Sequence, residues 1–160
     1  MKTILPRKVI SASVSGTLFA IILGLTLPHS TGDINLSFNQ SHFVSTITSI
    51  PVYMMYCFPA ILIYGVFTSI ISDKLGDFIS IKIKEKNVEP FVSGALHIIF
   101  GLILFWVSLG ASILFFITDR ILRSRYKRYK WLEAIKSLAI PVLTWLLFMG
   151  IVWGNNMYFS

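Results

Sequence analysis

The chain has 160 residues, a mean hydropathy of +0.76, 13% charged residues and a formal net charge of +7. This composition excludes an ordinary soluble domain, because so few charged side chains cannot cover so much apolar surface. A basic chain can bind nucleic acid, but here the basic residues lie beside apolar runs and form no separate basic module. We therefore expect the lipid bilayer and its anionic headgroups as partners, and no nucleic acid.

Four stretches of the sequence contain no Asp, Glu, Lys or Arg. They have 19, 23, 28 and 18 residues and cover 9–27, 50–72, 91–118 and 137–154. A helix needs about 20 mostly apolar residues to cross a hydrocarbon core roughly 30 Å thick. The pattern predicts an all-α protein, an integral membrane bundle of four transmembrane helices. The longest connection is too short for a separate domain, so residues 1–160 are predicted to form a single membrane domain.

The first stretch has two interpretations. Lys2, Arg7 and Lys8 followed by an apolar run resemble the start of a secretory signal peptide, which would be cleaved. The run ends without a clear small-x-small cleavage site, and its 19 residues exceed the usual signal core of about 7 to 15. We favour a retained membrane helix.

Small residues recur at helical spacing in three of the stretches. In lipid, such smooth faces let two helix backbones approach closely, so these residues are predicted to serve helix packing. The first stretch could use its face in an oligomer or against another span of the same chain, and we favour the internal contact. The predicted packing residues are Ala12, Gly16, Ala20, Gly24, Gly94, Gly101, Gly150 and Gly154.

The second stretch contains Pro59 well inside the predicted span and a single cysteine, Cys57. Proline removes a backbone donor and crowds the preceding turn, so a kink is expected there. The cysteine has no partner for an intrachain disulfide, and we interpret it as a small apolar side chain.

His97 is a candidate intramembrane polar site. Ionisable residues inside a membrane segment are functional candidates by default. The plainer alternative, which we favour, is that the side chain meets headgroup water or forms a hydrogen bond to the carbonyl of Ser93, one helical turn earlier. If the chain forms a path for a solute, we expect His97, Ser93, Ser108 and Tyr64 to line it.

The segment after the third stretch is rich in basic residues interleaved with aromatic ones. Clusters of 4 to 8 basic residues beside a membrane helix are typical of anionic-lipid contact and also orient the helix. The predicted lipid-contact and orientation residues are Arg120, Arg123, Arg125, Lys127, Arg128 and Lys130.

Three carboxylates, Asp73, Asp77 and Asp119, lie at the ends of the second and third stretches. If these ends meet, the side chains could bind a divalent cation. Local ion pairs are the simpler expectation, between Asp73 and Lys74 and between Asp119 and Arg123. We therefore expect no metal and no cofactor.

The orientation of the chain is not decided by its charges. Lys and Arg near span ends favour the cytoplasmic side. With four crossings and both termini inside, the counts are seven basic residues on each side of the membrane. We lean towards both termini inside, which places the third loop outside. Two alternatives stay open: a second loop outside, with its four lysines offset by four carboxylates, and insertion in both orientations.

The sequence contains none of the common protease, hydrolase or ATPase motifs, so we expect no enzymatic activity. Residues 64–75 (YGVFTSIISDKL), 97–101 (HIIFG) and 112–122 (SILFFITDRIL) resemble a family of small uncharacterised multi-pass proteins of Gram-positive bacterial membranes. The resemblance implies a cell-membrane location and no particular activity. We expect a non-enzymatic accessory protein that contacts itself or another membrane protein. The alternative is a small homo-oligomeric transporter or channel subunit.

Overall fold

A computed structural model describes residues 4–28, 38–84, 88–103, 105–125 and 129–159, and these form helices without any strand. The elements are α1 (Ile4–Thr26), α2 (Phe38–Ala60), the π-helix η1 (Ile61–Gly65), α3 (Val66–Ile83), α4 (Val88–Ile103), α5 (Phe105–Arg125), α6 (Trp131–Ser137) and α7 (Ala139–Phe159). The predicted all-α fold is confirmed.

Three helical segments of the described chain are long and apolar enough to cross a membrane: Ile4–Thr26, His42–Ile83 and Trp131–Asn155. They indicate a membrane protein. The predicted number of four transmembrane helices is not confirmed, because the segment Glu89–Ile103 is apolar but shorter.

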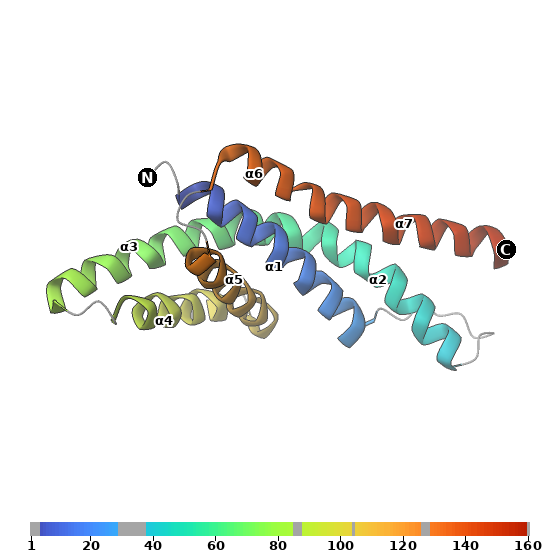
Figure 1. Ribbon diagram of the computed structural model, residues 1–160. Coiled ribbons are helices and arrows are strands. Elements are labelled where there is room, and N and C mark those ends of the chain that lie inside the picture. The colour runs from blue at the N-terminus through green and yellow to red at the C-terminus, as the bar shows by residue number, and fades with distance from the viewer. Residues whose placement is uncertain (1–3, 29–37, 85–87, 104, 126–128, 160) are drawn as a thin grey trace.

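Helices α1 and α2 run antiparallel and in close contact, and α7 lies along them (Figure 1). A Cβ atom built on Gly24 would overlap Ile50 Cγ1, and one built on Gly16 would lie 3.1 Å from Phe58 Cδ2. Only residues without a side chain allow the two helices to come this close. Helix α7 is mostly exposed, whereas α1 is mostly buried.

The second helix is much longer than predicted, since α2, η1 and α3 follow one another without interruption from Phe38 to Ile83. The π-helical turn at Ile61–Gly65 begins two residues after Pro59, which cannot donate a backbone hydrogen bond. Figure 1 shows that the helix bends where α2 joins α3, which is the position of the predicted kink.

The prediction of one continuous helix over 91–118 is wrong. The chain forms α4 and α5 instead, and the two helices fold back on each other. A Cβ atom on Gly94 would lie 3.3 Å from Phe116 Cζ, although one straight helix would separate these residues by about 33 Å. A Cβ atom on Gly101 would lie 3.1 Å from Leu109 Cα. The small residues let the two apolar helices pack closely, so each buries one face against the other.

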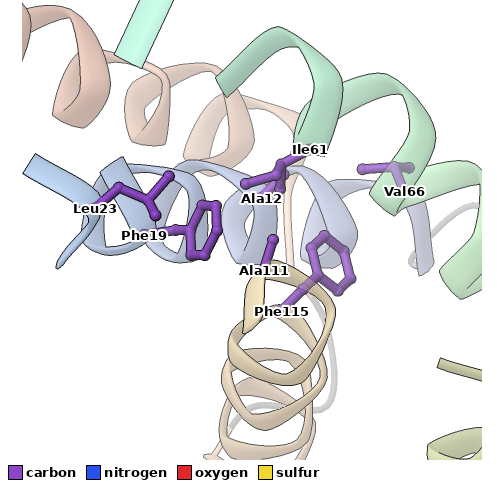
Figure 2. Close-up of a cluster of buried hydrophobic side chains, with 7 residues drawn as sticks. All are labelled: Ala12, Phe19, Leu23, Ile61, Val66, Ala111 and Phe115. Atoms are coloured by element: carbon purple, nitrogen blue, oxygen red, sulfur yellow. The ribbon is translucent and has the colours of Figure 1, made fainter. Parts of the chain in front are cut away.

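The main apolar core joins this hairpin to the rest of the molecule. Figure 2 shows Ala111 and Phe115 projecting from α5 towards α1, with Ile61 and Val66 close by. Phe115 is only 1% exposed. The core consists of Ala12, Phe19, Leu23, Ile61, Val66, Ala111 and Phe115.

Candidate functional site

A buried lysine lies at the centre of the most polar part of the structure. The ammonium group of Lys8, on α1, donates to Ser69 Oγ at 2.6 Å and is 2.6 Å from Asp73 Oδ2 and 2.7 Å from Asp119 Oδ2. A lysine has three N–H donors, and each has an acceptor here. Lys8 is fully buried.

Arg7 completes this ion cluster, which we define as Arg7, Lys8, Asp73 and Asp119. The Arg7 guanidinium lies 2.9 Å from Asp119 Oδ1 and 3.3 Å from Asp73 Oδ2. Ser11 donates to Asp119 at 3.3 Å and Ser93 donates to Asp73 at 3.0 Å. The cluster contains two positive and two negative groups, so its formal charge is zero.

The ion cluster is stable in the interior because each of its charged groups has a partner of opposite charge. The charged groups would be costly in an apolar interior if any of them lacked a partner, by about 3–5 kcal/mol for a broken pair. Here α1, α3 and α5 each contribute to one closed network. The arrangement joins the hairpin to α1 and the long helix, which makes it a structural connection between three elements far apart in the sequence.

The sequence-based prediction of local ion pairs is wrong. Asp73 pairs with Arg7 and Lys8 and not with Lys74, which is exposed. Asp119 also pairs with Arg7 and Lys8, while Arg123 pairs with another residue, Glu89. In the sequence, Arg7 and Lys8 look like charges that flank the first apolar run or that begin a signal peptide. Nothing in the spacing shows that residues 111 positions apart in the chain meet.

A second group of charges lies at the open end of the hairpin. Glu89, at the start of α4, pairs with Arg120 at 3.1 Å and with Arg123, both on α5. Burial opposes the charge of Arg123, but the hydrogen bond and ion pair with Glu89 hold the pKa of this guanidinium above its ordinary value. The guanidinium of Arg120 also lies over the ring of Phe116, 5.2 Å from its centroid.

The predicted lipid-contact residues therefore differ in their surroundings. Arg120 and Arg123 are engaged by Glu89, whereas Arg125 and Lys130 are exposed. Lys127 and Arg128 lie outside the described residues.

His97 is buried, with 4% of its surface exposed, and lies between α4 and α5. Its Nδ1 atom is 2.8 Å from the carbonyl oxygen of Ser93, as the plainer alternative expected. A carbonyl can only accept, so Nδ1 bears the proton, and in the neutral imidazole Nε2 then presents a lone pair. That Nε2 atom is buried and has no hydrogen-bond partner in the described part of the chain. Ser93 thus contacts both Asp73 and His97, and links the ion cluster to the histidine.

A cavity of about 60 Å³ borders His97. It lies between the π-helical turn and the hairpin, and its polar lining residues are Tyr64, Thr68, His97, Ser108 and Ser112. We expected His97 and Ser108 on one continuous helix. The structure instead brings them together across the fold of the hairpin.

Three of the lining hydroxyls donate their protons to backbone carbonyls. Tyr64 donates to Phe100 at 3.0 Å, Thr68 donates to Tyr64 at 2.9 Å, and Ser112 donates to His97 at 2.6 Å. Each hydroxyl has one proton, so these groups face the cavity as acceptors. Together with Nε2 of His97 they favour a small guest that donates hydrogen bonds.

The predicted packing residues divide into covered and uncovered sets. Ala12 and Ala20 are completely buried, and Gly16 and Gly24 contact α2, which corresponds to the internal-packing alternative. Gly94 and Gly101 contact α5. By contrast, a Cβ atom on Gly150 or Gly154 would meet no described atom within 4 Å.

Two of the three carboxylates considered for a metal converge, but on a lysine. Asp73 and Asp119 both contact Lys8, while Asp77 is exposed. Among the described residues, no group of three or more His, Cys, Asp or Glu side chains could hold a metal ion.

Comparison with known proteins gives no relatives: no protein-family model, no curated protein and no solved structure matches the chain. The resemblance to membrane proteins of Gram-positive bacteria therefore stays a prediction.

Proposed function

We propose that the chain is a multi-pass integral protein of the bacterial plasma membrane that acts without catalysis, as an accessory protein that contacts another membrane-embedded helix. The observation that supports this most directly is the uncovered glycine pair of α7. Gly150 and Gly154 are four residues apart, so they lie on one face of the helix, and nothing in the described chain covers them. This is the small-x-x-x-small spacing that lets helices pack closely in lipid.

The surroundings of this face agree with a helix partner. Val152 of α7 lines a small pocket together with Thr48, and Phe148 packs against the buried cluster that contains Ile50, so both lie towards the bundle. At about 100° per residue, Gly150 and Gly154 lie roughly opposite Val152. The partner would therefore occupy the side of α7 away from the bundle.

The test measures the mass and the co-purifying partners of the detergent-solubilised protein, for the unchanged chain and for a Gly150→Leu/Gly154→Leu variant. We expect a dimer or a complex that the variant loses. Ile151→Phe is the matched control, because it adds bulk about a quarter turn away and should leave the complex intact. A monomer without any partner in the unchanged chain would contradict the proposal.

A second candidate function, a small transporter or channel subunit, is favoured by the cavity at His97. Its acceptors could hold water or a small cation with N–H donors, and Ser93 connects His97 to the ion cluster. Reconstituted liposomes test this function. A flux of protons or ammonium that His97→Ala abolishes and Thr144→Ala, on α7, preserves would support it. Equal flux in liposomes with and without the protein would exclude it.

A further inference from the structure

Both ends of the hairpin lie at the same end of the molecule. Glu89 at the start of α4 pairs with Arg123 near the end of α5. Asp73, before the hairpin, and Asp119, towards its end, both contact the same Lys8 side chain. A helix that crossed a bilayer between these two carboxylates would place them about 30 Å apart. The segment from 88 to 125 therefore leaves this end of the molecule and returns to it.

The depth of the hairpin can be estimated along α1. Near its base, Asp119 contacts Lys8, and nearer its fold a Cβ atom on Gly110 would lie 3.2 Å from Phe19 Cε2. Eleven residues separate Lys8 from Phe19, which corresponds to about 16 Å of helix. The five further residues of α5 from Gly110 to Phe105 add at most about 8 Å, so the hairpin reaches about 24 Å and stops short of the far side of a hydrocarbon core about 30 Å thick.

A helix that ends inside a membrane must satisfy its last carbonyl groups, because neither water nor a following turn is there to do so. The carbonyl of Phe100 belongs to the last turn of α4, which ends at Ile103. It accepts a hydrogen bond from Tyr64, on the π-helical turn of the long helix. The Tyr64 side chain of a neighbouring helix thus caps the C-terminal end of α4 within the membrane.

We propose that residues 88–125 form a re-entrant helical hairpin, so that the chain crosses the membrane three times. The proposal rests on the proposed function, in that the chain must be an integral membrane protein. Three crossings also remove the equal division of basic residues between the two sides of the membrane that four crossings gave. With α1, the long helix and the α6–α7 segment as the three crossings, all fourteen Lys and Arg residues fall on one side. The first connection and the segment after residue 154 contain none, and Asp33 is the single charge on that other side.

This distribution assigns the orientation. The side with every basic residue is the cytoplasmic one, since Lys and Arg near span ends favour that side. The start of α1 and the base of the hairpin then face the anionic cytoplasmic leaflet, and the end of α7 faces outwards. With three crossings, the N-terminal end of the chain lies inside and the end of α7 lies outside. This replaces the expectation, made for four crossings, that both termini lie inside.

Single-cysteine labelling tests the proposal in intact cells. Cys57 is first replaced by serine, and one cysteine is then introduced at an exposed position: His42→Cys, Lys82→Cys, Ser124→Cys or Met157→Cys. A membrane-impermeant maleimide is added before or after permeabilisation. We expect the cysteines at 42 and 157 to react in intact cells, and those at 82 and 124 only after permeabilisation.

A fifth cysteine, Ile103→Cys beside the fold of the hairpin, distinguishes a re-entrant hairpin from one that crosses the membrane twice. We expect no reaction at 103, and labelling of 103 in intact cells would overturn the proposal.

Four crossings, insertion in both orientations and an inverted chain each give a different pattern at the other four positions. Four crossings would place positions 82 and 157 on one side of the membrane and positions 42 and 124 on the other. This result would overturn the proposal. Partial labelling of all four positions in intact cells would show insertion in both orientations, and a fully inverted pattern would refute the assignment of the cytoplasmic side. Failure of the proposed function is separately visible, because an alkaline wash would then release the unchanged chain from the membrane.

Discussion

Lys8 and Asp119, which are 111 residues apart in the sequence, form a buried ion pair of 2.7 Å. The pair fastens the end of α5 to the start of α1. Because Asp73 shares the same ammonium group, one side chain holds three helices in register.

Replacing this lysine should destabilise the protein strongly. Lys8→Met leaves Asp73 and Asp119 with Arg7 as their single cation, so a buried negative charge loses its partner. We expect a loss of about 3–5 kcal/mol in the free energy of unfolding. The midpoint of thermal unfolding in detergent measures the effect, and Lys74→Met, at an exposed lysine next to Asp73, should change it little.

The double variant Lys8→Met/Asp119→Asn separates charge balance from simple loss of contacts. It leaves one guanidinium and one carboxylate, so the remaining cluster is neutral again. We expect it to be more stable than Lys8→Met alone. If the double variant were the less stable of the two, charge balance would not explain the role of the lysine.

The close contact between α1 and α2 predicts a strong difference between two glycine substitutions. Gly24→Ala puts a methyl group into the space of Ile50 Cγ1, so the helices or the Ile50 side chain must shift. Such overpacking costs about 1–3 kcal/mol. Gly150→Ala meets no described atom within 4 Å and should leave the unfolding midpoint of the isolated chain unchanged or slightly raised. Similar midpoints for the two variants would argue against this helix contact.

The fold of the hairpin can be tested by cross-linking. Gly101 and Ser112 face each other, and a Cβ atom built on Gly101 would lie only 2.9 Å from Ser112 Cβ. Disulfides need a Cβ separation of about 3.5–4.5 Å, so a small opening of the hairpin suffices. In a Cys57→Ser background, Gly101→Cys/Ser112→Cys should oxidise to an intramolecular disulfide. A single helix would hold the two positions about 16 Å apart, and no disulfide would form.

Removing the cap at the end of α4 should cost less stability than removing Lys8. Tyr64→Phe removes the hydrogen bond to the Phe100 carbonyl and leaves that acceptor without its partner. We expect a loss of about 1–3 kcal/mol in the free energy of unfolding. Tyr56→Phe is the control, since Tyr56 is 71% exposed. Hydrogen exchange of the α4 amides should rise in the first variant alone.

Much of the helical structure was predictable from the charge-free runs, because a run of about 20 apolar residues favours helix whatever its partners. The break of the helix within 91–118 was not predictable, because no charged residue and no proline interrupts that run. Gly94 and Gly101 were recognised as packing residues, but spacing alone does not say that their partner is the other half of the same stretch. The ion cluster was missed for a related reason, because Arg7 and Lys8 look like ordinary flanking charges until the fold brings two carboxylates to them.

The neutrality of the ion cluster has an electrical consequence. One elementary charge that moves across a membrane gains or loses about 2.3 kcal/mol per 100 mV. A field pulls the cations and the carboxylates in opposite directions, but each group lies within 3.3 Å of its partner. Across a core about 30 Å thick, the potential therefore acts on each pair with only about a tenth of that energy. The fastening between α1, α3 and α5 is therefore expected to hold equally well in an energised and in a depolarised cell.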